Sequence, residues 1–276
     1  MTDKITRGLG AALGALMLGG LAATPASATM VQVTVSNNQG AGGLSLTPLY
    51  FGFHNGSVDL FNAGAAASNG IETIAETGDF GPLRDERLAQ QADSAGGVAL
   101  GTSIGAPGPI EPGESASFTV DLDSVANRYM LFTSMVIPSN DTFVGVDDPT
   151  RFSLFDAAGN FLGPQTINID GSFAYDAGTE VNDASATGGA AFVIGADAAQ
   201  GAAENGVITP ASSLAAFIGA SLANGTTLGS NIDFSSPSFS FASVEIAAVP
   251  VPPAFLLMFT GLAGLGFAAR RKKQQS

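Results

Sequence analysis

Two short acidic segments carry the side chains of this sequence that are best suited to bind a ligand. Asp141 lies in residues 138–146, just after a nearly all-apolar run, and Asp176 and Glu180 flank an Ala-Gly-Thr turn further along the chain. If the fold brings these three carboxylates to one rim, they repel one another unless a cation lies between them. Carboxylates on flexible loops favour Ca²⁺ over Mg²⁺. On spacing alone the pattern is a weak signal for a calcium site, because acidic loop residues are common, and solvated acidic loops that bind nothing are the alternative that spacing favours.

Most other catalytic chemistry lacks the residues that it needs. The chain has no cysteine and one histidine, His54, which follows an apolar run and which we interpret as structural. A Ser-His-Asp triad would have to use this histidine, no Gly-x-Ser-x-Gly motif occurs, and a zinc site would have too few ligands. Carboxylates could still serve a glycoside hydrolase, but there is no tryptophan and there are only three tyrosines to stack on sugar rings. We therefore expect a protein that is not an enzyme, with a glycoside hydrolase as the alternative.

The charge of the chain is distributed unevenly. Residues 29–248 hold four arginines, no lysine and 23 of the 24 carboxylates, a net charge of −19, against −14 for the whole chain. Such a surface repels phosphate backbones, so nucleic acid is not an expected partner, and it attracts cations. Without cysteine there are no disulfides, so packing must stabilise the fold, and a bound metal could add to it.

Both ends of the chain have the features of export signals. Two cations, an apolar segment over residues 9–23 and Ala-Ser-Ala at 26–28 predict a signal peptide, residues 1–28, that signal peptidase removes. The C-terminal residues 249–276 combine a proline-rich hinge, an apolar run of 16 residues (254–269) and a basic cluster. As a transmembrane helix this run would span roughly 24 Å, slightly short of the ~20 residues that such helices usually need. The terminal cations would stay cytoplasmic, so the domain before the hinge is expected outside the cell.

The tail, residues 249–273, resembles the PEP-CTERM class of bacterial sorting signals in its Val-Pro-x-Pro variant. In that class an exosortase, a membrane-embedded cysteine protease, is thought to cut near the prolines, and the proteins accompany exopolysaccharide and biofilm production. The resemblance implies an exosortase-like partner and a cell-surface or extracellular location, with the helix as a transient or permanent membrane anchor. A plain stop-transfer anchor is the alternative.

The segment between the two ends predicts one all-β domain, residues 29–248. From period-two alternation or continuous apolar character, strands are predicted at 31–35, 116–121, 129–137, 151–155 and 238–246. A change of apolar parity in the last of these predicts a bulge. Helical patterns are confined to a short helix capped by Ser68 and to residues 83–91, and residues 184–203, rich in Ala and Gly, are expected to form a surface loop. Many short strands with one or two short helices favour an antiparallel β-sandwich.

The two acidic segments also resemble motifs of the spondin domain, the N-terminal module of F-spondin and mindin. Pro-Ser-Asn-Asp-Thr-Phe-Val-Gly at 138–145 is similar to the family's Pro-Ser-Pro-Asp-Trp-Phe-Val-Gly, and Asp-Ala-Gly-Thr-Glu at 176–180 to its Asp-Ala-Gly-Thr-Asp. An upstream stretch, 54–78, is similar to the bacterial branch of the family. The resemblance covers roughly residues 31–208.

The resemblance implies a C2-like β-sandwich with calcium at one end, held by Asp141, Asp176 and Glu180. Glu180 stands where the family has aspartate, Thr142 replaces its tryptophan, and the cysteines of the animal domain are absent. The last two changes argue against animal-type receptor binding but leave the calcium site intact. We therefore expect an exported, calcium-binding surface or matrix adhesion protein whose partner is an exopolysaccharide or another matrix component. An inert structural surface protein is a further alternative.

Overall fold

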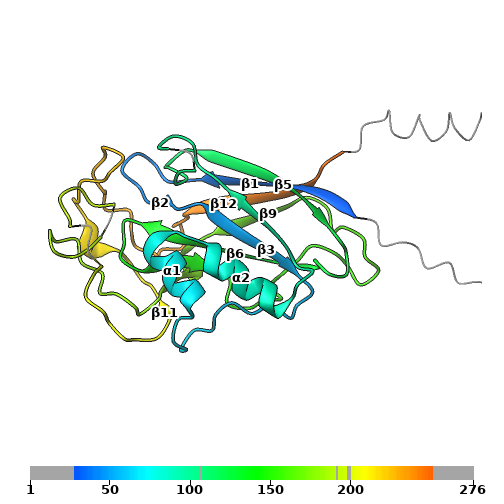
Figure 1. The fold of residues 1–276 in the computed structure, drawn as a ribbon. Coiled ribbons are helices and arrows are strands. Elements are labelled where there is room, and N and C mark those ends of the chain that lie inside the picture. Colours follow the sequence, from blue (N-terminus) through cyan, green and yellow to red (C-terminus); the bar gives the residue numbers. More distant parts are fainter. Residues whose placement is uncertain (1–27, 106, 191, 198–199, 251–276) are drawn as a thin grey trace, which may run out of the picture.

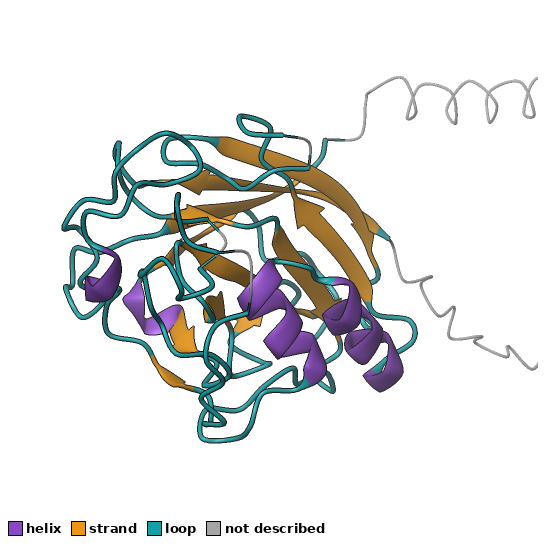
Figure 2. Ribbon diagram, turned by 60° about the vertical axis from the view of Figure 1, so that its left-hand side comes forward, coloured by secondary structure: helices purple, strands orange, loops and turns teal. Residues whose placement is uncertain are grey.

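Two antiparallel β-sheets pack face to face, with helices on one outer side (Figure 1, Figure 2). The computed structural model describes residues 28–105, 107–190, 192–197 and 200–250. The predicted signal peptide and C-terminal tail lie almost entirely outside these residues, so the predicted transmembrane helix is not described. Within the described ranges, no helix is both long and apolar enough to cross a membrane.

The first sheet consists, in spatial order, of β5 (Ser115–Leu122), β1 (Thr29–Asn37), β12 (Ala242–Ala248) and β9 (Gln165–Ile169). Every pairing in it is antiparallel. The central strand β1 has the alternation that the sequence predicts: Val31, Val33 and Val35 are buried, and the residues between them are at least partly exposed. This sheet therefore presents one face to the core and the other to solvent.

The second sheet consists, in spatial order, of β11 (Thr209–Pro210), β10 (Ala174–Asp176), β7 (Thr142–Gly145), β6 (Tyr129–Ile137), β3 (Leu49–His54) and β4 (Ala95–Ala99), with β2 (Ser45–Leu46) and β8 (Phe152–Ser153) also paired to β6. β6 is the central strand that the sequence predicts, and every residue in it except Tyr129 is buried. A continuous apolar run is expected where both faces of a strand are covered.

Two short helices cover the outer face of the second sheet (Figure 1, Figure 2). α1 (Asn69–Thr77) begins after Ser68, whose hydroxyl accepts the backbone N–H of Ile71, and ends at Gly78 in the left-handed conformation. α2 (Gly81–Gln90) packs against α1, and α1 in turn contacts β6 and β7. The prediction of a helix capped by Ser68 is confirmed, as is the antiparallel β-sandwich with two short helices.

Aromatic side chains fill the core between the sheets. Phe118 of β5 reaches across to the second sheet, where its ring centroid lies 5.4 Å from that of Phe51 in β3. Gly97 of β4 makes room for this ring, because a Cβ there would lie 1.9 Å from Phe118. Phe132 of β6 contacts both Phe51 and Phe173. Burial of each such ring contributes about 1.5–3 kcal/mol, so dense aromatic packing can stabilise a chain without disulfides.

The prediction of a bulge within residues 238–246 is wrong. β12 begins at Ala242 and pairs with β1 without interruption. Phe239 and Phe241 precede the strand and pack together, with ring centroids 4.7 Å apart. The apolar parity changes because these phenylalanines belong to a loop and not to the strand. The strand expected at 151–155 is also shorter, since only β8 forms there.

Both ends of the described fold lie at the same end of the sandwich, here named the terminal end (Figure 1). β1 and β12 are antiparallel neighbours, with Val31 opposite Ala248. The short connection 123–128 brings the start of β6, Tyr129, to this end as well. At about 3.3 Å per residue, β6 then carries the chain roughly 26 Å to Ile137, at what we name the distal end.

Candidate metal centre

The sheet register brings two of the predicted ligands together at the distal end. β6 ends at Ile137, the chain turns back into β7, and β7 pairs with β10 so that Thr142 lies opposite Asp176. Asp141, one residue before Thr142, is therefore beside Asp176. The backbone N–H of Ala177 donates to the carbonyl of Asp141 at 3.2 Å and fixes this arrangement.

The side chain of Asp141 is completely buried. Its Oδ2 accepts the backbone N–H groups of Thr179 at 2.9 Å and Glu180 at 3.1 Å, and the hydroxyl of Thr179 at 3.3 Å. Its Oδ1 accepts the side-chain amide of Asn182 at 3.1 Å. Because each carboxylate oxygen has two lone pairs, Oδ1 can take one further partner.

Burial and charge act together on Asp141. Desolvation, and next the negative charge of Asp176, raise its pKa from 3.8 to about 7, although hydrogen bonds from residues 179 and 180 lower it. A cation placed between the two aspartates would lower the pKa again, because an opposite charge favours the ionised form. The fold therefore concentrates an electrostatic cost at a point where a metal ion would relieve it.

Asn182 joins the two aspartates directly. Its side-chain nitrogen lies 3.1 Å from Asp141 Oδ1, 3.0 Å from Asp176 Oδ2 and 3.2 Å from Thr142 Oγ1. Its Oδ1 accepts the backbone N–H of Asn140 at 2.9 Å, which fixes the orientation of the amide. The amide thus donates to one oxygen of each aspartate and holds the two side chains together. The sequence analysis missed this residue, since an asparagine after an acidic motif carries no distinctive pattern.

Glu204 is the third carboxylate of the group. One oxygen from each of Asp141, Asp176 and Glu204 lies within 4.8 Å of the other two. The backbone N–H of Glu204 donates to the carbonyl of Thr179 at 2.9 Å, which places this exposed residue beside the acidic turn. Two oxygens bound to one Ca²⁺ at 2.3–2.6 Å are at most about 5 Å apart, whereas Mg²⁺ at 2.0–2.1 Å requires about 4 Å. The three residues can therefore hold a metal ion.

The turn after Asp176 requires glycine. Gly178 has a φ of +68°, and a Cβ there would lie 2.7 Å from the backbone N and O of Val207. The Asp176 carboxylate accepts the N–H of Gly178 at 2.9 Å, and the carbonyl of Gly178 accepts the N–H of Gly206 at 2.7 Å. This close backbone approach is what brings the segment with Glu204 to the site.

Glu180, the third ligand expected from the sequence, makes a different contact. Its Oε2 accepts the side-chain amide of Asn140 at 3.3 Å, and only 6 % of the residue is exposed. The same amide donates to the carbonyl of Gly188 at 2.7 Å. It is the backbone N–H of Glu180 that reaches Asp141. Metal binding by the Glu180 carboxylate stays a prediction, to be tested against Glu204.

His54 lies at the other end of the sandwich, where it closes β3 and is completely buried. Its Nδ1 accepts the backbone N–H of Gly56 at 3.1 Å. Burial, and next the positive charge of Arg87, lower its pKa to about 4, so the ring is neutral at pH 7. These contacts support the structural interpretation of this histidine.

The hairpin that carries Asp141 lies within a recognised domain. A family model described as Spondin_N matches residues 45–188, just over half of the 276 residues. The chain belongs to the Spondin_N family. The matched part of this spondin domain includes Asp176 and Glu180, whereas Glu204 lies beyond it. Comparison with curated proteins finds no match.

Spondin_N membership confirms the family resemblance of the paired motifs, implies an extracellular protein and suggests an adhesion-type role. The assignment to the bacterial branch stays a prediction. So does the PEP-CTERM-like tail, which lies outside the described residues from 251 onward.

Proposed function

We propose that the chain is an exported adhesion protein of the cell surface or extracellular matrix, and that calcium stabilises its spondin domain. The observation that carries this proposal is the acidic group at the distal end, in which buried Asp141 lies with Asp176 and Glu204 inside 4.8 Å. Carboxylate oxygens at this spacing suit Ca²⁺, and extracellular calcium modules bind it with dissociation constants of about 10⁻⁴–10⁻³ M. The acidic, lysine-free surface and the family membership support the same function.

Calcium would act here by joining segments that are far apart in the sequence. Asp141 and Asp176 are positioned by the paired strands β7 and β10. Glu204 comes from the far end of the long connection that follows Glu180. A shared ion would therefore tie this connection to the sheet and give the distal end a fixed surface for a matrix partner.

The burial of Asp141 supports a binding role over a catalytic one. A general acid or base must come within hydrogen-bond reach of its substrate, whereas Asp141 has no exposed surface and is surrounded by donors from residues 179–182. Its raised pKa is nevertheless a property of glycosidase general acids, and this keeps a glycoside hydrolase as the second candidate. Loss of polysaccharide turnover in Asp176→Asn, with calcium binding intact, would favour that candidate.

The proposed route to the surface rests on the two ends of the sequence. Signal peptidase would remove residues 1–28, and an exosortase-like protease would act on residues 249–276. The partner would be an exopolysaccharide or another matrix component. Mass spectrometry of the protein recovered from producing cells tests both cleavages, since each leaves a defined new terminus.

The test of the function is calcium titration of the full chain in a mild detergent, combined with retention on exopolysaccharide isolated from the producing cells. We expect calcium binding that is lost in Asp141→Ala and Asp176→Ala, and retention that disappears in EDTA. Calcium binding without retention would refute the adhesion role. Retention that is unchanged in EDTA would refute the role of calcium.

A further inference from the structure

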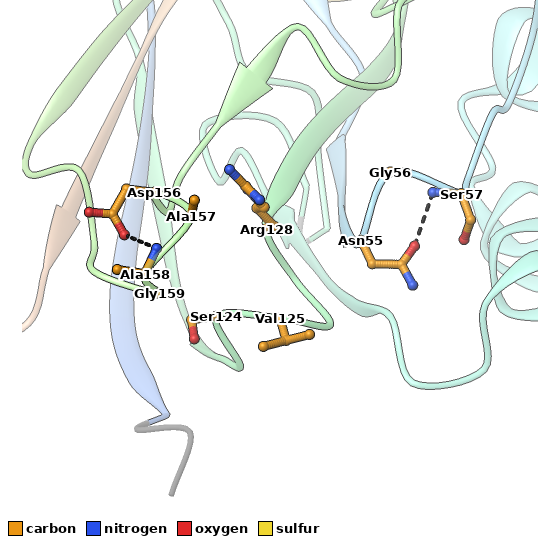
Figure 3. Close-up of a pocket in the computed structure, with 10 residues that line it drawn as sticks. All are labelled: Asn55, Gly56, Ser57, Ser124, Val125, Arg128, Asp156, Ala157, Ala158 and Gly159. Atoms are coloured by element: carbon orange, nitrogen blue, oxygen red, sulfur yellow. Dashed lines mark hydrogen bonds between the residues drawn. The ribbon is translucent and has the colours of Figure 1, made fainter. Parts of the chain in front are cut away.

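A cavity of about 730 Å³ lies at the terminal end of the sandwich, at the opposite end of β6 from the acidic group. Its walls are the turn 55–57 after β3, part of the connection between β5 and β6, and the turn 156–159 after β8. Figure 3 shows Arg128 between the two turns, with Ser124 and Val125 on a third side. Three separate loops thus surround one cationic side chain.

Arg128 has no carboxylate partner in the part of the chain that the structure describes. Its Nε is buried and makes no hydrogen bond with any described residue. The guanidinium lies 5.5 Å from the ring centroid of Tyr129 and forms no hydrogen bond or ion pair with a side chain of the described residues. A buried N–H donor such as this Nε is costly without an acceptor, because it has lost its water without gaining a partner.

The other three arginines of the domain are each engaged. Arg84 forms an ion pair with Asp85 at 2.9 Å, the one ion pair among the described residues. Arg87 donates to the hydroxyl of Tyr50 at 2.5 Å. Arg151 lies over the ring of Phe173, 4.2 Å from its centroid. Arg128 differs from these three in having a buried nitrogen without an acceptor, in a domain that has 23 carboxylates to offer.

The remaining polar groups of the cavity are mostly unused donors. The side-chain nitrogen of Asn55 and the hydroxyl of Ser124 form no hydrogen bond with any described residue, while Asn55 Oδ1 accepts the N–H of Ser57 at 3.0 Å. Asp156 also lines the cavity, but its oxygens accept three hydrogen bonds from Ala158 and Asn160 within its own turn. The cavity thus offers a cation, an amide and a hydroxyl, with its one acid already satisfied.

We infer that this cavity binds a uronate, a sugar that carries a single carboxylate. The planar guanidinium of Arg128 matches a carboxylate with two parallel hydrogen bonds. The Asn55 amide and the Ser124 hydroxyl suit the ring hydroxyls, and Val125, which is 71 % exposed, offers an apolar surface to the C–H face of the ring. The net charge of −19 on residues 29–248 disfavours a dense polyanion, so the saccharide carries isolated carboxylates among neutral sugars.

This second site goes beyond the calcium-dependent function, because it uses no residue of the acidic group. Binding at the cavity is therefore independent of calcium. A chain that binds a uronate in EDTA supports this inference even if the calcium role fails, and a chain that binds calcium without a uronate overturns this inference alone.

The experiment is a titration of the ¹⁵N-labelled full chain with D-glucuronate in EDTA and a mild detergent, followed by amide chemical shifts. D-glucose and acetate are the comparison probes. We expect shifts confined to residues 55–57, 124–128 and 156–159, with glucuronate binding at least tenfold tighter than either probe. Equal binding of acetate would overturn the saccharide specificity, and shifts located elsewhere would overturn the site.

Three variants sharpen the test. Arg128→Gln should weaken glucuronate binding at least tenfold. Ala157→Glu, at an exposed position of the cavity wall, places a competing carboxylate beside Arg128 and should have the same effect without disturbing the core. Arg84→Gln removes an exposed, already paired arginine as a matched control and should change nothing. Glucuronate binding that survives in both Arg128→Gln and Ala157→Glu would overturn the inference.

Discussion

Removing calcium should expose an unfavourable pH dependence of stability that originates at Asp141. Its pKa is about 7 in the folded protein against 3.8 for the ordinary side chain. The folded state binds the proton of Asp141 more tightly than the unfolded state does. The protonated side chain therefore makes its full contribution to the free energy of unfolding below about pH 4, and this contribution is lost as the pH rises to about 7. A difference of about three pKa units, at 1.36 kcal/mol each, gives a loss of up to about 4 kcal/mol.

His54 acts in the opposite direction over part of this range. Its pKa falls from 6.5 to about 4 on folding, so its contribution to stability is present above about pH 6.5 and is lost as the pH falls toward 4. The two effects largely cancel between about pH 4 and 6.5, and the unfolding free energy of the wild type alone would conceal both. The informative quantity is therefore the difference between the wild type and Asp141→Asn, which keeps His54 and removes the titrating acid.

The assay is urea unfolding of the full chain in a mild detergent, followed by circular dichroism from pH 4.5 to 8 in EDTA and in excess calcium. In EDTA the stability of the wild type relative to Asp141→Asn should fall by several kcal/mol across this range. In calcium the fall should vanish, and a concentration one hundredfold above the dissociation constant should add about 2.7 kcal/mol at pH 8. A pH-independent difference in EDTA, or an equal slope in calcium, would refute the electrostatic argument for the site.

Three further predictions concern the ligand set, the acidic turn and the core. Glu204→Gln should weaken calcium binding about tenfold or more in calorimetry, a loss of about 1.4 kcal/mol of binding free energy. Glu180→Gln should leave calcium binding nearly unchanged. The reverse result would make Glu180 the ligand. Gly178→Ala should lower the unfolding free energy by about 2–4 kcal/mol and weaken calcium binding. The control is Gly113→Ala, at a residue with a similar φ of +79° but open space for a Cβ, which should cost about 1–2 kcal/mol. Equal losses in urea unfolding would contradict the backbone contact at Gly178. Phe51→Ala should cost about 3–5 kcal/mol in the same assay, and a loss below about 1 kcal/mol would refute its central position.

The features that were predictable from the sequence are those with local causes. A capping serine, Ser68, sets the start of α1, and Pro138 follows a nearly all-apolar run that becomes β6. Asp141 and Asp176 could be proposed together because each lies in a distinctive motif next to a strand. Their actual contact depends on the β7–β10 register, which no local pattern specifies.

The missed features depend on contacts between distant segments. Glu204 reaches the site because its backbone pairs with the turn at Thr179 across a long connection rich in Ala and Gly. Asn182 was missed because its importance lies in its contacts with Asp141, Thr142 and Asp176, which are a property of the folded arrangement. The false bulge near Phe239 shows the same limit, since an apolar residue in a loop cannot be told from one in a strand by parity alone.

The pairing of the first and last strands also determines how the domain would carry load. β12 is hydrogen-bonded on both sides, to β1 over seven residue pairs and to β9 over five. If a matrix partner holds the distal end while the tail holds the cell, tension enters β12 at Ala248 and runs along the strand. The hydrogen bonds of an antiparallel ladder lie across that direction, so they are sheared together instead of being opened one after another. The sandwich would then resist detachment as a single mechanical unit, with the distal loops as the first part to yield.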